Sequence, residues 1–370
     1  MNLESSPKII MNPGPEFHAA ARIWQGIPGL ERAANGRLWA TWYTGEQGEG
    51  PNNHVVVVTS EDDGYTWTEP VMAILPATRE ERCYDACLWV DPLGRLWLFW
   101  AQSEMRPEHC DGHAGVWAIR TSDATGPSPQ WSEPVRLSDG VMMNKPTVLS
   151  SGEWLFPVAV WSLQKQAVSN PAYPQLSNVL CSEDQGGTWT LRGSADVPDR
   201  TFDEHMLVER RDGSLWMLVR TTYGVGESVS FDRGRTWAPG CPTNITGPCS
   251  RFFIRRLRSG NLLLVNHLPS LPGVRANLAA KLSKDDGATW QSTSLMLDER
   301  TGVSYPDGVE APDGRIYIIY DHNRGDRRYS VGNEEREILM AVFTERDIEA
   351  GHPIDPRTRL RVTVNKLPCV

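Results

Sequence analysis

An eight-residue pattern, Ser-x-Asp-x-Gly-x-Thr-Trp, recurs four times along this chain and limits the folds open to it. The copies are Ser60–Trp67, Ser182–Trp189, Ser230–Trp237 and Ser283–Trp290, and a degenerate fifth runs from Thr121 to Trp131. In such a pattern the Asp accepts hydrogen bonds from backbone N–H groups two residues on, and the Gly supplies an unusual backbone angle. The Trp ring packs between neighbouring units. The pattern therefore predicts a tight turn between strands, with structural rather than catalytic Asp and Trp residues.

A second repeat covers the chain more completely, because a turn with Gly runs into an apolar strand six times at intervals of 47 to 61 residues. The turn glycines are Gly36, Gly94, Gly152, Gly213, Gly260 and Gly314. A short apolar run precedes each turn, and in most units a third β-rich run, the Asp-containing turn and a fourth run follow. Units of about four short strands are typical of β-propellers. The sequence thus predicts an all-β fold, a six-bladed β-propeller of four-stranded blades with Asp-containing turns.

We expect residues 1–370 to form a single closed domain. A prior of about 150 residues per domain would suggest two or three, but no linker rich in Pro, Gly or Ser separates a second unit. The segment Arg359–Val364 is predicted to add one more strand, and it or the N-terminus is expected to close the ring.

Composition narrows the classes of partner. The chain has 37 Lys and Arg against 46 Asp and Glu, a net charge of −9, and no basic block, which disfavours nucleic acid and anionic membrane surfaces. Its apolar runs are far shorter than the roughly 20 residues that span a bilayer. The segment Met1–Ile10 does not resemble a signal peptide, so we expect a cytoplasmic protein. The sequence leaves a homo-oligomer open.

Seven cysteines, without a signal peptide, favour reduced thiols. Cys83, Cys87, His109, Cys110 and His113 lie close in sequence, but they have neither C-x-x-C nor H-x-x-x-H spacing, so we expect no metal site there. Nothing in the sequence demands a metal or an organic cofactor, although a structural Ca²⁺ in a loop stays open.

The six turns also give a common reference for the channel-lining strands. About nine residues before the turn glycines stand Gly26/Ile27, Asp85, Met143–Lys145, Glu204, Arg251 and Tyr305. Four of these six positions carry a charged or phenolic side chain, whereas a purely structural channel favours apolar or small residues. This clustering predicts a functional site at the channel.

The Asp-containing turns and these channel positions resemble the sialidase (neuraminidase) superfamily over nearly the whole chain. The resemblance implies a six-bladed propeller that removes a terminal sialic acid with a Tyr nucleophile, a Glu that activates it, three Arg residues around the substrate carboxylate and an Asp acid/base. Tyr305, in Ser304-Tyr305-Pro306-Asp307, matches the nucleophile. Glu204 matches the activating Glu, and Arg220 and Arg275 match the second and third Arg.

The chemistry gives these residue types a reason. Sialic acid carries a carboxylate on its anomeric carbon, which would repel a carboxylate nucleophile but not a neutral phenol. A phenol with an ordinary pKa of about 10 needs a base beside it, and Glu204 would be that base. Arg side chains bind a carboxylate bidentately. Tyrosine-based sialidases are known exceptions to the two-carboxylate rule for glycosidases.

The sequence departs from the family pattern twice. Gly26, in Gln25-Gly26-Ile27-Pro28, stands where the family has its first Arg, and Arg22 would need rearrangement to replace it. The segment Gly50–His54, where the acid/base Asp is expected, has no Asp, and Glu46 and Glu49 lie nearby but out of alignment.

The other candidates keep two interpretations each. Asp85 is a replacement acid or a salt-bridge partner of Arg251, and His54 is the alternative acid, since the pKa of an ordinary His suits proton transfer near neutrality. Lys145 and Arg251 are pocket cations or channel counter-charges. The remaining candidate substrate-binding residues are Arg22, Gln25, His205 and Asp307.

These features predict an exo-acting glycoside hydrolase of the sialidase type that removes a terminal, acidic sugar from a glycan, so carbohydrate is the expected partner. One alternative is the same scaffold acting on a rhamnosyl or uronosyl linkage, by hydrolysis or by β-elimination with Tyr305 or His205 as base. Another is a non-catalytic carbohydrate-binding propeller. The fold alone does not decide among them.

Overall fold

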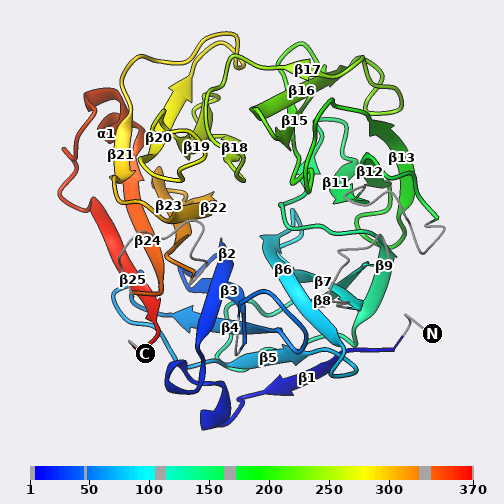
Figure 1. Cartoon of the computed structure of the whole chain (residues 1–370), viewed down its shortest axis with the longest axis vertical. Helices are drawn as coiled ribbons and strands as arrows, with labels where there is room; N and C mark the ends of the chain where they lie inside the picture. The colour runs from blue at the N-terminus through cyan, green and yellow to red at the C-terminus, as the bar shows by residue number, and fades with distance from the viewer. Residues whose placement is uncertain (1–4, 46–47, 105–113, 162–171, 325–334, 369–370) are drawn as a thin grey trace.

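Each repeat of the sequence folds into an antiparallel sheet, and six such sheets follow one another around a ring in chain order (Figure 1). The computed structural model describes residues 5–45, 48–104, 114–161, 172–324 and 335–368. Five sheets have four strands and the first has five. The predicted all-β, six-bladed propeller is therefore confirmed.

Within each blade the strands run from the centre of the ring outward in chain order. Blades one and two contain β2 (Trp24–Arg32), β3 (Leu38–Gly45), β4 (His54–Ser60) and β5 (Met72–Leu75), then β6 (Glu81–Val90), β7 (Leu96–Glu104), β8 (Gly115–Thr121) and β9 (Val135–Asp139). Blades three and four contain β10 (Thr147–Val148), β11 (Trp154–Ala159), β12 (Ser177–Ser182) and β13 (Thr190–Ala195), then β14 (Met206–Glu209), β15 (Leu215–Thr221), β16 (Gly224–Ser230) and β17 (Cys241–Pro242). Blades five and six contain β18 (Phe253–Arg256), β19 (Leu262–His267), β20 (Leu278–Ser283) and β21 (Leu295–Asp298), then β22 (Val303–Glu310), β23 (Arg315–His322), β24 (Glu337–Thr344) and β25 (Arg359–Lys366).

The ring closes without exchanging strands between the first and last blades. The expected extra strand near the C-terminus is β25, the fourth strand of blade six, where it pairs with β24. The N-terminal strand β1 (Lys8–Met11) instead pairs with β5 on the outer edge of blade one. Contacts between the innermost strands β2 and β22 join the two ends of the ring.

The four Asp-containing turns connect the third and fourth strands of their blades. In the turn after β16, the Ser230 hydroxyl accepts the Gly234 N–H at 2.8 Å, and Asp232 Oδ1 accepts the Thr236 N–H at 2.8 Å. The other three turns repeat these bonds at 2.8 Å. The Asp acceptor therefore reaches four residues ahead, not the two we expected, and the Gly midway between the Asp and the donor has a positive φ in each turn. In the degenerate fifth turn, Asp123 accepts the Gly126 N–H at 2.9 Å.

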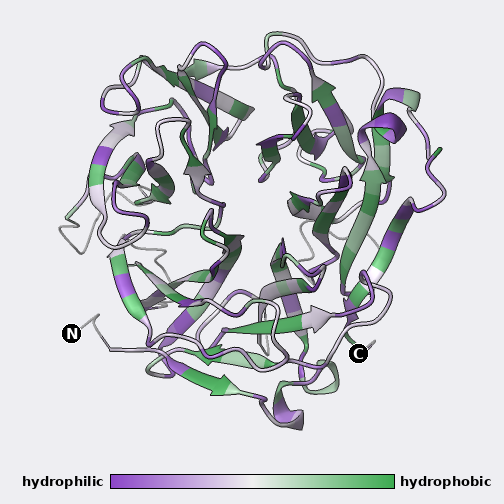
Figure 2. Ribbon diagram, turned by 180° about the vertical axis from the view of Figure 1, so that it is seen from behind, coloured by the Kyte–Doolittle hydropathy of each residue, from purple (hydrophilic) through white to green (hydrophobic). Residues whose placement is uncertain are grey.

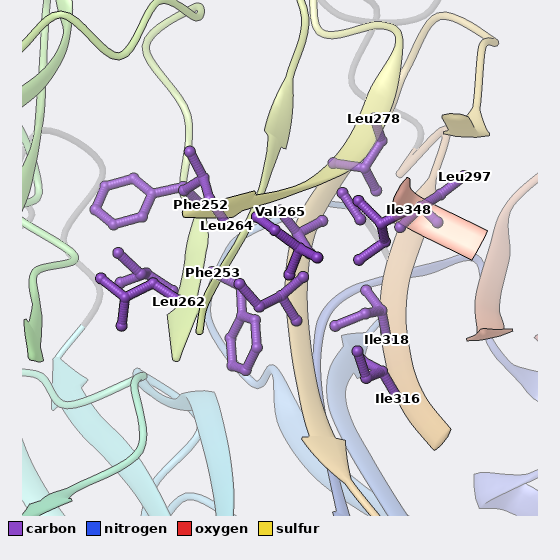
Figure 3. Close-up of a cluster of buried hydrophobic side chains, with 14 of the residues drawn as sticks. Phe252, Phe253, Leu262, Leu264, Val265, Leu278, Leu297, Ile316, Ile318 and Ile348 are labelled. Carbon is purple, nitrogen blue, oxygen red and sulfur yellow. The ribbon is translucent and has the colours of Figure 1, made fainter. Parts of the chain in front are cut away.

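Apolar residues concentrate along the strands and form the core between adjacent sheets (Figure 2). Trp189 of an Asp-containing turn lies edge-on to Trp97 of the preceding blade, with ring centroids 6.1 Å apart, so a turn Trp does pack between units. Burying each large apolar side chain contributes roughly 1.5–3 kcal/mol, which rewards the close stacking of blades. Figure 3 shows part of this core, where Leu278, Leu297 and Ile348 lie together.

Helical structure is limited in the described residues to two short 3₁₀ turns, Pro15–Phe17 and Ala19–Ala21, and the helix α1 (Glu345–Ala350), which packs against β20 and β21. No helix among the described residues has the length and apolar character needed to cross a membrane.

Candidate functional site

Local bulges in the innermost strands position the central side chains. Asp85, Glu204 and Tyr305 all have positive φ, at 51°, 44° and 56°. The pairing registers of β6 and β22 shift at Asp85 and Tyr305, as an extra residue in a strand requires. Left-handed backbone is uncommon at non-glycine residues, and the instances that occur cluster at functional sites. Bulges therefore place Asp85 and Tyr305 on comparable points of separate blades, and Glu204, just before β14, has the same left-handed backbone.

A three-residue hydrogen-bonded cluster joins blades four and six. The Tyr305 hydroxyl donates to Glu204 Oε1 at 2.9 Å. Arg220, at the end of β15, donates from Nη1 to the same oxygen at 2.5 Å and to the Tyr305 oxygen at 3.0 Å. All three side chains are buried, with Tyr305 and Glu204 each 5% exposed. A phenol, a carboxylate and a guanidinium predicted from the sequence are therefore in direct contact.

The electrostatics keep the phenol neutral at rest. Burial, and then the Glu204 carboxylate, raise the pKa of Tyr305 to about 12, against the opposing effect of three guanidiniums. At neutral pH the hydroxyl therefore keeps its proton and shares it with Glu204. A nucleophile of this kind has to transfer that proton as it attacks, and Glu204 Oε1 is placed to take it.

Arg275 approaches the same phenol from the segment before β20. Its Cζ atom lies 5.4 Å from the Tyr305 ring centroid, and its Nη2 donates to the Cys249 carbonyl at 3.1 Å. The Cys249 sulfur accepts a hydrogen bond from Arg220 Nε at 3.3 Å. Cys249 thus holds both arginines beside Tyr305. The two arginines that the family resemblance assigned to the substrate carboxylate therefore flank the phenol.

Asp85 is a buried carboxyl on β6 of blade two. Burial raises its pKa to about 8, and the nearby carboxylates of Glu49 and Glu204 add to the shift. The group is therefore protonated at neutral pH and can donate a proton. Arg251 forms its ion pair with Asp307, with Nη2 3.5 Å from Oδ1, and no ion pair between Arg251 and Asp85 is found among the described residues.

The two histidines lack the properties of an acid. Burial lowers the pKa of His54 to about 4, and its ring lies edge-on to Phe17 at 5.3 Å. Burial likewise lowers the pKa of His205 to about 4, and its Nε2 bonds to the Asn178 carbonyl at 2.8 Å. Both rings are neutral at pH 7 and have no proton to give from a cation. The lowered pKa of His54 therefore disfavours its interpretation as the proton donor.

A second layer of charges lies further along the inner strands. Lys145 donates to the carbonyls of Leu30 and Leu88, both at 2.6 Å, and lies 3.3 Å from carboxylate oxygens of Glu31 and Asp307. Arg251 donates to Asn144 at 2.7 Å and to the Met143 carbonyl at 3.0 Å. Asp307 is the common partner of Lys145 and Arg251, and these contacts favour the interpretation of both as channel counter-charges. These bonds occupy them inside the channel.

The remaining candidates lie beside other parts of blade one. Arg22 donates to Asn365 at 3.0 Å and to the His18 carbonyl at 3.3 Å, and its guanidinium lies 5.7 Å from the Trp42 ring centroid. Gln25 donates to the Arg336 carbonyl at 3.1 Å. Neither shares a described hydrogen bond with Tyr305, so Arg22 does not fill the place left by Gly26.

The turn spacing missed Arg324, which follows β23. Its Cζ lies 4.5 Å from the Tyr305 ring centroid, and its Nη1 donates to Glu49 at 2.9 Å. Arg324 lies outside the repeated blade pattern, so no periodic signal marks it. Glu46 lies outside the described residues.

Metal-ligating groups are not gathered near Tyr305 in the part of the chain described. Cys83 and Cys87 are buried free thiols, while His109, Cys110 and His113 lie outside the described residues. Elsewhere His322, Glu335 and Glu337 have ligand atoms within 4.8 Å of one another. Lys366 donates to Glu335 at 2.6 Å and Arg300 to Glu337 at 3.2 Å, so cationic side chains already balance these carboxylates.

This fold is that of a sialidase-like β-propeller. The chain belongs to the family described as the BNR repeat-like domain, whose sequence model matches residues 36–318. A sialidase from Paraclostridium sordellii is 25% identical over 240 residues, a match that spans 57% of this chain and 56% of that relative.

Solved structures agree on the fold. A Hadza microbial sialidase superposes with a TM-score of 0.66 at 20% identity, covering 86% of this chain and 66% of that one. The intramolecular trans-sialidase from Ruminococcus gnavus, in complex with oseltamivir carboxylate, superposes with a TM-score of 0.63 at 15% identity, covering 95% of this chain and 100% of that one. At these identities the similarity establishes architecture and leaves activity to be argued from the site.

Proposed function

We propose that this protein is an exo-acting glycoside hydrolase that releases a terminal, sialic-acid-like sugar from a glycan. Tyr305 is the nucleophile, Glu204 its base, and Arg220 and Arg275 bind the carboxylate of the sugar. The observation that carries the proposal is the shared Glu204 oxygen, 2.9 Å from the Tyr305 hydroxyl and 2.5 Å from Arg220. A purely structural tyrosine has no need of a buried ion pair at its hydroxyl.

The chemistry follows from this contact. As the Tyr305 oxygen bonds to the anomeric carbon, the bond to the leaving oxygen breaks and the phenolic proton passes to Glu204. Arg220, 3.0 Å from the Tyr305 oxygen, stabilises the negative charge that develops there. Water then attacks the same carbon, the bond to Tyr305 breaks, and Glu204 returns the proton to the phenol.

Asp85 is the proposed proton donor to the leaving oxygen. Its pKa of about 8 keeps it protonated at neutral pH, whereas His54, with a pKa of about 4, has lost its proton. After the first step the Asp85 carboxylate accepts a proton from the attacking water. The protons therefore balance over the two steps.

The test is hydrolysis of a fluorogenic α-sialoside by the parent protein and by Tyr305→Phe. We expect turnover by the parent and a loss of about a hundredfold or more in the variant, because the oxygen that forms the new bond is missing. The matched control is Tyr320→Phe, which removes a buried hydroxyl 3.1 Å from Asp298. Equal turnover by the parent and Tyr305→Phe would remove Tyr305 from the mechanism.

A second candidate is a carbohydrate-binding propeller without catalysis. It is favoured by Gly26, which replaces one expected Arg, and by the segment Gly50–His54, which contains no Asp. Glycan binding that survives both Tyr305→Phe and Glu204→Gln, with no turnover of α-sialosides, rhamnosides or uronosides by the parent, would establish it. An unsaturated product absorbing in the near ultraviolet would instead identify elimination from a uronic acid.

A further inference from the structure

Three guanidinium groups, not two, surround the Tyr305 phenol. Arg220 bonds to its oxygen at 3.0 Å, while Arg275 and Arg324 lie 5.4 Å and 4.5 Å from its ring centroid. Arg324 follows β23 and so approaches from blade six, beside β2 of blade one. It is buried, with 7% of its surface exposed. A third buried cation in such a cluster requires negative partners.

The side chain of Arg324 occupies the space directly over Gly26. A Cβ atom added at Gly26 would lie 2.2 Å from Arg324 Cδ and 2.7 Å from its Cγ. Atoms in real structures do not approach this closely, so any side chain at position 26 would displace Arg324. An arginine at position 26 and an arginine in the present position of Arg324 exclude each other. The glycine is therefore matched to an arginine that comes from another blade.

One side of the Arg324 guanidinium is anchored by the fold. Its Nε lies 3.5 Å from Asp321 Oδ2, which also accepts the Ile27 N–H at 2.8 Å. The other Asp321 oxygen accepts the Ser304 hydroxyl at 2.7 Å. Asp321 is fully buried and so fixes Arg324 against both β2 and β22. Asp321 contacts the Nε side of the guanidinium, so the Nη1 side can bind a second carboxylate.

In the structure, the Nη1 side of the Arg324 guanidinium binds a surface carboxylate. Arg324 Nη1 donates to Glu49 Oε1 at 2.9 Å, and the Glu49 side chain is 46% exposed. The contact shows that a carboxylate reaches Arg324 from the solvent side. Because Glu49 is exposed, its carboxylate is hydrated by water when another carboxylate replaces it, so giving up this bond costs it little.

We propose that Arg324 is a carboxylate-binding residue for the substrate and that Glu49 occupies its outer end until a substrate carboxylate replaces it. The proposal rests on the proposed glycosidase function and adds to it a residue that selects sugars with a carboxylate on the anomeric carbon. A neutral sugar offers no charge to exchange for Glu49. The acidic sugar exchanges one carboxylate for another and also reaches Arg220 and Arg275, so charge-assisted bonds select it.

The test measures binding of the 2,3-unsaturated derivative of N-acetylneuraminic acid and of its methyl ester by calorimetry. The parent is expected to prefer the acid. In Arg324→Gln the acid should bind about tenfold more weakly or worse, with the ester little changed, since a lost charge-assisted pair affects only the acid. Arg346→Gln, on the exposed surface of α1, is the matched control. Thermal unfolding of each variant reports whether it folds.

The outcomes separate the two proposals. If the parent prefers the acid and Arg324→Gln keeps that preference, the inference about Arg324 is wrong while the proposed function stands. If the parent binds neither compound, both the proposed function and the inference about Arg324 are wrong. The swapped variant Gly26→Arg/Arg324→Gly offers a rescue: recovery of the acid preference beyond that of Arg324→Gln supports the matched pair, and no recovery counts against it.

Glu49→Gln gives an independent check on a surface residue. Removing the competing carboxylate should tighten binding of the acid severalfold and leave the ester unchanged. Unchanged or weaker acid binding would contradict the exchange of Glu49 for the substrate carboxylate.

Discussion

Tyr305 and Glu204 share one hydrogen bond, but substituting them should affect the stability of the protein differently. Tyr305 loses only its hydroxyl in Tyr305→Phe, which leaves the ion pair of Arg220 with Glu204 intact at 2.5 Å. Glu204→Gln instead leaves a buried guanidinium without its carboxylate. Breaking a buried pair in this way costs about 3–5 kcal/mol.

We therefore expect Tyr305→Phe to unfold near the parent temperature and Glu204→Gln to unfold well below it, although both lose turnover. Thermal unfolding followed by circular dichroism, beside the sialoside assay, checks this separation. Equal stability of the two variants would show that Arg220 does not depend on Glu204.

Asp85 gives the protein a pH dependence of known sign. Its pKa is about 8 in the folded protein, against about 4 in an unfolded chain. Between these values the folded state holds a proton that the unfolded state has released, so this group makes stability fall as pH rises through the window. Asp85→Asn removes that contribution.

The unfolding temperature of Asp85→Asn, relative to the parent, should accordingly rise between pH 5 and pH 8.5. Scanning calorimetry at several pH values measures the difference, in which the other titrating groups cancel. A difference that stays constant with pH would place the Asp85 titration outside this range.

The repeated hairpin of each blade explains why the turn spacing located the site. Asp85, Glu204 and Tyr305 stand the same number of residues before their turns, and each blade repeats the same hairpin, so a constant spacing becomes a constant position on the ring. Arg220 and Arg275 followed from family resemblance. Arg324 did not follow from either, because its contact with Gly26 joins residues almost 300 positions apart and lies outside the repeat.

The Asp-containing turns contribute to blade packing through their glycines. Gly287 has a φ of 85°, and a Cβ added there would lie 2.3 Å from the Trp216 ring of the preceding blade. Gly94 has a similar φ of 79° but no atom within 4 Å of such a Cβ. The two positions therefore separate the cost of backbone strain from the cost of crowding.

We expect Gly94→Ala to destabilise the protein by about 1 kcal/mol, through strain alone. Gly287→Ala should lower the free energy of unfolding by about 1–3 kcal/mol more than Gly94→Ala, because the added methyl group must displace a packed ring. Urea denaturation measures both. Equal losses would mean that the turn does not pack tightly against the neighbouring blade.

Across the whole molecule, a buried charge layer holds blades together beneath the candidate site. Lys145 of blade three reaches carbonyls on blades one and two and carboxylates on blades one and six. Burial opposes its charge, but Asp307 and Glu31 hold the pKa of Lys145 above its usual value. These contacts of Lys145 therefore link several blades at the centre of the ring.

Lys145→Met should lower the free energy of unfolding by about 3–5 kcal/mol, since it leaves buried carboxylates without their cation. Lys284→Met is the control, because the Lys284 pair with Glu349 is exposed and exposed pairs contribute little. Denaturation by guanidinium chloride measures the free energy of unfolding of both variants. A small loss for Lys145→Met would show that Arg251 alone balances the layer.

The sequence predicted the architecture well because six repeats report the same hairpin independently. It did not predict how the ring closes: β25 completes blade six while β1 joins the outer edge of blade one, and both choices depend on which sheet edge is free after folding. The interpretation of Lys145 and Arg251 also depended on the fold, because only packed neighbouring strands bring Leu88, Asn144 and Asp307 to them.

The central claim is that Tyr305 forms a covalent bond to the sugar. A fluorinated sialosyl fluoride tests it directly, because an electronegative fluorine beside the anomeric carbon slows release of the glycosyl intermediate. Peptide mass spectrometry of the treated protein should find the added sugar on Tyr305 and none in Tyr305→Phe. A protein that turns over sialosides yet carries the label on another residue, or no label, would contradict the account.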